Sequence, residues 1–375
     1  MNYDEPVKYW DYLPAYFRNR QEILKITDEV FSSGRLILGS RVDSFEKNFA
    51  KFCGTAFGIG VNSCTDALFL ALKALGIKEG DEVITVSNTA VPTVAAIRAA
   101  GATPVFVDVE PDTYLMNTSL LERLVSIRTR CIIPVHLCGQ AVSMGPLLDI
   151  AAKHGLSVIE DCAQAAGASY KGTRVGSFGQ IGAFSFYPTK ILGAFGDAGM
   201  LTTSSEQIAG HLRCLRFYGM KGEYYSEEEG YNSRLDELQA AILDFMLIGL
   251  EKEVRQRQII ADRYSKGLGG VGDILLPVTQ PERDHRYYLY TIRTGRRDEL
   301  KKFLSGFGIE ARINYPYPIH LMRGYAILGY KEGDLPVTER LAEEILSLPM
   351  YGDLPMKHVD RVINAVKCFF AGVAS

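Results

Sequence analysis

The sequence has little excess charge of either sign and no long hydrophobic run. Its 41 Lys and Arg residues and 44 Asp and Glu residues leave a net charge of -3, and no basic block marks a nucleic acid or an anionic membrane as a partner. No apolar run reaches the length of a membrane span, and the first residues, MNYDEPVKYWDYLPAYF, are polar and aromatic, unlike a secretion signal. We therefore expect a cytoplasmic protein that binds neither nucleic acid nor membrane.

The sequence also lacks a cysteine framework. Its seven cysteines form no CxxC pair, which fits reduced thiols in a reducing compartment. His136 and Cys138, in PVHLCGQ, offer two metal-ligand types without a second cluster, so core packing is the better interpretation. We expect no metal site.

The sequence does have a large hydrophobic fraction, and its strand-like and helix-like patterns alternate regularly. The 375 residues are 47% hydrophobic, enough for two domains and a large core. Continuous β-rich runs alternate with helical patterns, which predicts a mostly parallel sheet with helices on both faces. The strand patterns cover 57–62, 81–87, 103–110, 131–139 and 156–161, and the helical patterns cover 65–76, 91–101, 119–127 and 144–155.

The C-terminal part has a different organisation. Residues 235–268 repeat apolar positions at helical spacing, which predicts a helical bridge between domains. The segments YYLYTIR and ELKKFLSGFGIEARI and the last helical pattern predict a small α+β domain. We therefore predict a large α/β domain over 1–250 and a small α+β domain over 251–375.

In parallel sheets, ligands bind at the carboxyl ends of the strands, so the residues that follow each strand pattern are the candidate site. After the first pattern, NSCTDAL places Ser63, Cys64 and Thr65 at a strand-to-helix junction. Free backbone N–H groups there favour an anion such as phosphate. The alternative is that Ser63 or Thr65 simply caps the helix.

Asp161 ends the LSVIED strand pattern, where a buried carboxylate needs a positive partner. That partner is either a structural arginine, Arg174 or Arg216, or a protonated heteroaromatic nitrogen, with Gln164 reaching a neighbouring oxygen. Lys190, in SFYPTKILGAFGDAG, follows another strand pattern, although a lysine after a turn proline is often only a solvated loop residue. An anion cradle, a buried aspartate and a strand-end lysine together match the needs of pyridoxal 5'-phosphate (PLP).

The chain resembles the DegT-type sugar-nucleotide aminotransferases over nearly its whole length. The resemblance rests on six segments: GRLILGSRVDSFEKNFAKFCG, NSCTDALFLALKALGIKEGDEVI, GATPVFVDVEPDTY, IEDCAQAAGA, SFYPTKILGAFGDAG and GYNSRLDELQAAIL. It implies the fold-type I architecture of PLP enzymes and a homodimer with shared active sites. Two departures are Cys64, where the family usually has glycine, and the absence near Ala90 of the aromatic residue that stacks on the cofactor.

The resemblance also implies roles for single residues. Lys190 is the Schiff-base lysine and the catalytic base, Asp161 pairs with the pyridinium nitrogen, and Gln164 contacts the ring hydroxyl. The phosphate is held by Ser185 and by the residues at the helix start, with an asparagine from the neighbouring subunit. These phosphate-binding residues are Ser63, Cys64, Thr65, Ser185 and Asn232.

The implied reaction moves the amino group of glutamate to a nucleotide-linked keto-sugar. The SFYPTK segment is closest to the branch that aminates C3 of a 3-keto-6-deoxyhexose, often on dTDP, and we expect Tyr187, Tyr317 and His320 to contact the substrate. For these residues the alternatives are that Tyr187 packs in the core and that His320, in a proline-rich loop, makes structural hydrogen bonds, which is the more usual role of such a histidine. The alternatives are C4 amination of a 4-keto-6-deoxyhexose, amination of an inosose-type cyclitol ketone, and a non-catalytic regulator that kept the fold. A sugar dehydratase is excluded, because that branch has histidine in place of the lysine.

Overall fold

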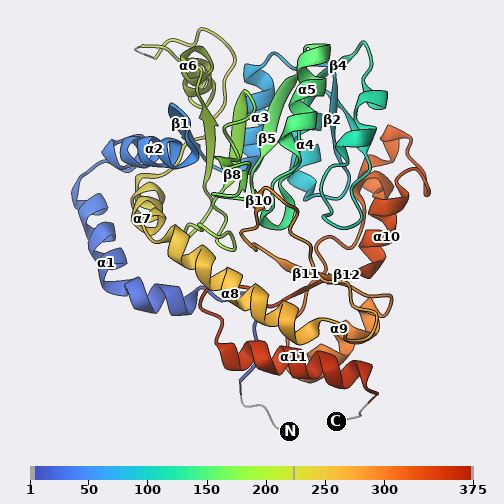
Figure 1. Cartoon of the computed structure of the whole chain (residues 1–375). Helices are drawn as coiled ribbons and strands as arrows, with labels where there is room; N and C mark the ends of the chain where they lie inside the picture. The colour runs from blue at the N-terminus through green and yellow to red at the C-terminus, as the bar shows by residue number, and fades with distance from the viewer. Residues whose placement is uncertain (1–4, 223, 373–375) are drawn as a thin grey trace.

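The computed structural model describes residues 5–222 and 224–372, and a seven-stranded sheet forms its centre (Figure 1). The strand order is β1-β9-β8-β5-β4-β2-β3. Strand β9 (Gly199–Thr203) is antiparallel to both of its neighbours, β1 and β8, while the other ladders are parallel. The predicted mostly parallel sheet is therefore confirmed. The other strands are β1 (Phe57–Val61), β2 (Glu82–Val86), β3 (Thr103–Val107), β4 (Thr129–Ile132), β5 (Ser157–Asp161) and β8 (Ile181–Ser185).

Helices cover both faces of this sheet, as predicted. Successive strand residues point to opposite faces, so Val158 and Ile159 of β5 enter two different hydrophobic clusters. The first cluster is completed by α2 (Ser40–Cys53), α5 (Met144–His154) and α7 (Glu237–Leu247), and the second by α3 (Cys64–Ala74), α4 (Val91–Ala99) and α6 (Glu206–Leu215). Burial on both faces explains why the strands lack an alternating pattern.

A second core lies below the sheet in Figure 1. It packs around Tyr264 and Tyr290, and its small antiparallel sheet pairs β11 with β12. Leu250 and Val254, at the start of α8, pack in the first cluster of the large sheet, whereas Tyr264, later in the same helix, packs in this lower core. One helix therefore belongs to both cores. The predicted domain boundary at 250/251 stays a prediction. The elements here are α8 (Leu250–Leu268), β11 (Tyr290–Arg293), α9 (Arg297–Gly306), β12 (Ile345–Leu348) and α11 (Met356–Phe370).

The remaining elements lie at the periphery. Helix α1 (Leu13–Ser32) packs against α7, and α10 (Pro336–Glu344) leads into β12. Three short strands, β6 (Ser169–Tyr170), β7 (Thr173–Arg174) and β10 (Arg283–Asp284), form a separate sheet. Because β10 follows α8 while β6 and β7 precede β8, this sheet connects the two parts of the chain.

Two helical predictions need correction. Residues 119–127 form only two 3-10 turns, because the side chains of Ser126 and Arg128 bond to the buried Glu82 carboxylate and draw the chain out toward β4. The predicted bridge over 235–268 is two helices, α7 and α8, with Ile248 and Gly249 between them.

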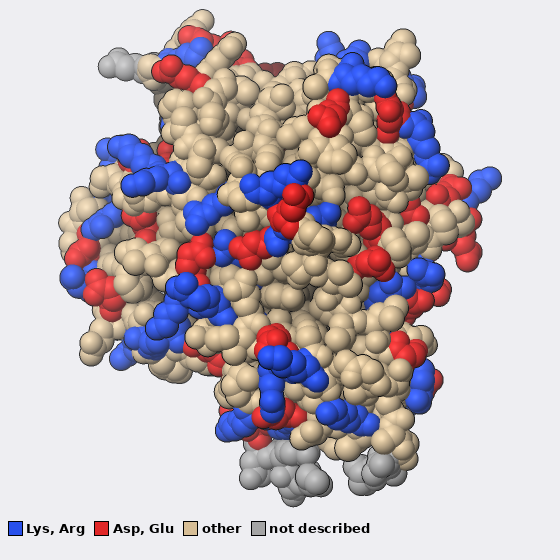
Figure 2. Space-filling view, viewed as in Figure 1, with Lys and Arg blue, Asp and Glu red and all other residues tan. Residues whose placement is uncertain are grey.

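The surface carries both signs of charge. On the face in Figure 2, Lys and Arg side chains are interspersed with Asp and Glu side chains. Across the described helices, none has both the length and the apolar composition needed to cross a lipid bilayer.

Candidate active site

The start of α3 presents unused hydrogen-bond donors at the end of β1. Ser63 is the N-cap, and its hydroxyl oxygen accepts the N–H of Asp66 at 3.1 Å. Within the described part of the chain, the N–H groups of Cys64 and Thr65 have no acceptor. The capping role of Ser63 and the anion-binding role of the helix start are therefore compatible, since each uses different donors.

The sheet register connects Ser185 to this helix start through one residue, Gly199. Ser185 of β8 pairs with Gly199 of β9, and Gly199 pairs with Val61 of β1. A Cβ atom on Gly199 would lie 2.4 Å from the carbonyl carbon of Ser63 and 2.8 Å from the amide nitrogen of Cys64. Glycine is thus required for β9 to approach the helix start, and Ser185 is the β8 residue paired with that glycine.

Asp161 is a buried carboxylate at the end of β5. One oxygen, Oδ2, accepts the hydroxyl of Thr93 at 2.7 Å, and the other accepts the N–H of Ala163 at 3.1 Å. Burial raises the pKa of Asp161, and the bonds from Thr93 and Ala163 and the charge of Lys190 oppose that rise. Lys190 is thus close enough for the two charges to interact.

The two arginines considered as structural partners of Asp161 pair elsewhere. Arg216 bonds to Glu46 and to the carbonyl of Gly60, and Arg174 bonds to Glu251. Among residues 5–222 and 224–372, no Lys or Arg forms an ion pair with Asp161. A buried carboxylate without a salt-bridge partner is the observation that fits a cationic ring nitrogen.

Lys190 lies over the ring of Tyr288, with its Nζ 4.5 Å from the ring centroid. The turn that begins at Tyr187 fixes its backbone, because the Lys190 N–H donates to the Tyr187 carbonyl at 2.8 Å. Burial raises the pKa of the Cys64 thiol, the charge of Asp161 raises it further, and the charge of Lys190 lowers it. Lys190 is therefore partly buried against an aromatic ring and is not a fully solvated loop lysine, and its role at the site stays a prediction.

Gln164 is fixed by two bonds and keeps one donor. Its Oε1 accepts the N–H of Cys138 at 2.8 Å, and its Nε2 donates to the hydroxyl of Tyr315 at 2.9 Å. The amide nitrogen has a second hydrogen without an acceptor in the described residues. That hydrogen suits the predicted contact with a ring hydroxyl.

The residues considered as zinc ligands have structural roles. His136 accepts the N–H of Val142 at its Nδ1 and bonds through its Nε2 to the buried Glu160 at 3.1 Å. Glu160 also accepts three backbone N–H groups, from residues 176, 178 and 179. The pair therefore organises the loop that leads into β8.

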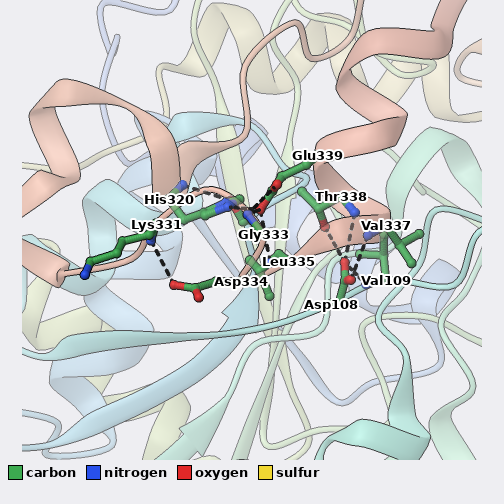
Figure 3. A network of polar contacts seen from close by, with 11 residues as sticks. Asp108, Val109, His320, Lys331, Gly333, Asp334, Leu335, Val337, Thr338 and Glu339 are labelled. Atoms are coloured by element: carbon green, nitrogen blue, oxygen red, sulfur yellow. Dashed lines mark hydrogen bonds and ion pairs between the residues drawn. The ribbon is translucent and has the colours of Figure 1, made fainter.

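The predicted substrate contact of His320 is not supported. Its side chain is 1% exposed, Nδ1 bonds to the Ser87 hydroxyl at 2.8 Å, and Nε2 bonds to Glu339 at 3.0 Å. Figure 3 shows His320 and Glu339 in a network that also includes Asp108, which accepts backbone N–H groups at the start of α10. Both ring nitrogens of His320 are engaged, so it anchors the chain segment instead of facing a sugar. Tyr187 and Tyr317 are 53% and 69% exposed and free to contact a ligand.

Three residues at the site had no sequence signal. Tyr288 lies under Lys190, Tyr315 fixes Gln164, and Thr93 bonds to Asp161. Each lies far from its partner in sequence, and none belongs to a motif that would single it out.

Comparison with known proteins identifies the chain. The model of the DegT/DnrJ/EryC1/StrS aminotransferase family matches residues 18–367. The chain belongs to this family. It is similar to the dTDP-3-amino-3,4,6-trideoxy-alpha-D-glucose transaminase of Micromonospora megalomicea subsp. nigra, with 48% identity over 97% of this chain and 99% of the relative. It is also similar to the pleiotropic regulatory protein of Geobacillus stearothermophilus, with 44% identity over 96% of this chain and 97% of the relative.

A solved structure, S. venezuelae DesV in complex with a ketimine intermediate, matches with a TM-score of 0.95. The identity is 43%, and the match covers 97% of this chain and 98% of that chain. The predicted family, fold and aminotransferase activity are therefore confirmed, and so is the predicted cofactor, PLP. The roles of single residues stay predictions. The contacts described above are compatible with those of Cys64, Thr65, Asp161, Gln164 and Lys190 and do not favour that of His320.

We expect Gly199→Ala to weaken cofactor binding at least tenfold, because the added methyl group would collide with the backbone that forms the phosphate cradle. The measurement is titration of the apoprotein with PLP, followed by absorbance. Gly210→Ala is the control, because nothing lies within 4 Å of a Cβ there and alanine favours its helix. Equal PLP affinity of Gly199→Ala and the wild type would contradict the cradle.

We expect Asp161→Asn to stabilise the apoprotein near pH 8, raising its Tm by about 1–4 °C. Burial raises the folded-state pKa of Asp161, so folding disfavours the ionised form, and this cost is present above that pKa and absent below the unfolded value. The gain should therefore shrink as the pH falls toward 4. Thermal melts of both apoproteins from pH 5 to 8 measure it, and a less stable variant at pH 8 would refute the account.

Proposed function

We propose that this aminotransferase transfers the amino group of glutamate to a nucleotide-linked keto-sugar, at C3 of a dTDP-3-keto-6-deoxyhexose. The carrying observation is the buried Asp161 at the end of β5, which has no ion-pair partner in the described chain although it accepts two hydrogen bonds. The name of the relative from M. megalomicea, a 3-amino sugar transaminase, supports the choice of C3.

In this proposal each site residue has one role, which follows from its position. The helix start at Cys64 and Thr65 binds the phosphate, and Asp161 holds a proton on the ring nitrogen. Bound PLP supplies an electron sink and carries the amino group between donor and acceptor. Lys190 holds the cofactor through its Nζ, and the same amine, once free, moves the proton to and from the substrate carbon.

A cleft next to Lys190 has room for a sugar nucleotide. Its volume is about 870 Å³, and its walls come from α1, the segment 188–196, the start of α8 and residues 351–353. Trp10 and Tyr12 line it with their rings stacked at 5.6 Å between centroids. Such a wall suits the flat base of a nucleotide, which supports a substrate larger than a free sugar.

The deciding experiment supplies purified protein with PLP, glutamate and one keto-sugar at a time, and locates the new C–N bond by NMR. We expect nitrogen at C3 from a dTDP-3-keto-6-deoxyhexose and no product from Lys190→Ala. Lys153→Ala, at an exposed surface ion pair, should behave as the wild type. Nitrogen at C4 of a 4-keto-6-deoxyhexose would overturn the choice of carbon, and a protein that aminates no ketone would favour the regulator.

The proposal includes a homodimer in which Asn232 binds the phosphate in the neighbouring subunit. The backbone of Asn232 forms an isolated antiparallel bridge with that of Phe217. Its carbonyl accepts a hydrogen bond from the side-chain amide of Asn62 at 3.0 Å. Its own side chain is exposed and has no hydrogen bond in the described residues. An asparagine held by its backbone, with a free amide, is suited to reach another subunit.

Mixed dimers test this sharing. Lys190→Ala and Asn232→Ala should each be nearly inactive as homodimers, while a verified heterodimer should recover up to half of the wild-type sites, because one site then contains both intact residues. The measurement is transamination by heterodimers purified with two different tags. Heterodimers as inactive as their parents would rule out the shared site.

A further inference from the structure

Thr93 makes the shortest hydrogen bond to Asp161. Its hydroxyl donates to Oδ2 at 2.7 Å, and both side chains are buried, with Thr93 1% exposed and Asp161 3% exposed. The other oxygen of the carboxylate has only the 3.1 Å bond from the N–H of Ala163. Thr93 is therefore the one side chain of the described residues that bonds to Asp161.

The direction of a second bond follows from this one. The hydroxyls of Thr89 and Thr93 are 3.1 Å apart, and either oxygen could in principle donate. An ionised carboxylate only accepts, so the single hydrogen of Thr93 points to Asp161. Thr89 must then donate to Thr93, which gives a directed chain from Thr89 to Thr93 to Asp161. In a buried environment, such a chain strengthens each of its bonds.

Thr93 itself is held firmly in place. It lies in the first turn of α4, and its β-branched side chain has few rotamers there. The preceding segment is anchored at two points: Ser87 bonds to His320, and Asn88 donates to the carbonyl of Tyr114 at 3.4 Å. His320 belongs to the network in Figure 3, so the bonds of that network, through Glu339, also hold the segment that precedes Thr93 in place.

We infer that Thr93, supported by Thr89, is a positioning residue that keeps Asp161 ionised and fixes the direction in which its carboxylate faces the ring nitrogen of bound PLP. The inference deepens the proposed function and rests on it. The physical reason is that burial alone favours the protonated carboxyl, which has no negative charge with which to stabilise a protonated ring nitrogen. The Thr93 hydroxyl lowers the pKa of Asp161 and thus opposes burial.

The test compares Thr93→Val, which removes the hydroxyl at nearly constant volume, with Thr93→Ser, which keeps it. Thr93→Val should lower kcat about ten- to a hundredfold with little change in the KM for the keto-sugar, as expected for a lost bond to a charged group. The pH at which kcat falls on the acid side should rise, because Asp161 is protonated more easily. The visible absorption of bound PLP should change with pH along the same shifted curve. Thr93→Ser should restore both readouts to within about threefold of the wild type.

Thr113→Val is the matched control. Thr113 is also buried, and its hydroxyl donates to the carboxylate of Glu110 at 2.7 Å, away from Asp161. This variant should lose stability without moving the pH profile or the spectrum. Thr89→Val removes a hydroxyl one hydrogen bond farther from the carboxylate. It should shift the pH profile and the PLP spectrum in the same direction as Thr93→Val, but by less. This variant tests the inference if Thr93→Val does not fold.

The outcomes separate the inference from the proposed function. A wild-type protein that binds PLP but aminates no sugar would defeat the proposed substrate, while the spectral titration would still test Thr93. An unchanged pH profile and spectrum in Thr93→Val, or a Thr93→Ser variant as impaired as Thr93→Val, would overturn the role of the hydroxyl. An effect of Thr113→Val equal to that of Thr93→Val would also overturn it.

Discussion

The carboxylate of Asp161 is buried at the end of a central strand, and it has two hydrogen bonds but no ion pair among the described residues. Placing an anion there opposes folding unless a cation joins it. The surrounding structure fixes the carboxylate without an ion pair, and the two arginines that the sequence offered as partners, Arg216 and Arg174, pair with Glu46 and Glu251. A buried carboxylate left without an ion pair in this way is what the proposed pairing with a positively charged ring nitrogen requires.

The other parts of the site depend on how the sheet brings strand ends together. Strand β9 enters between β1 and β8 against the direction of its neighbours, and Gly199 lets it touch the start of α3. Ser185 is the residue of β8 that pairs with Gly199, so β8 ends one strand away from the unused N–H groups of Cys64 and Thr65. The cradle, the carboxylate and the amine thus lie on one sheet edge, although they come from segments far apart in the chain.

Much of this arrangement could be predicted from the sequence. The strand and helix patterns predicted the parallel sheet, and the rule that ligands lie at strand ends selected Ser63, Asp161, Gln164 and Lys190. The failures concern contacts that sequence does not encode locally. The family resemblance suggested a substrate contact for His320, but Ser87 and Glu339 bond to both of its ring nitrogens, which is the structural role that a histidine in a proline-rich loop more often has.

By itself the sequence determined which residue types follow each strand, because hydrophobic periodicity and helix signals act over a few neighbouring positions. It also determined the family, through motifs spread over nearly the whole chain. Only the tertiary structure decided the partners of the charged groups. Arg216 pairs with Glu46, the Thr93 hydroxyl donates to Asp161, and the ring of Tyr288 lies under the amine of Lys190. These pairings depend on sheet order and register, which bring together residues that no local pattern relates.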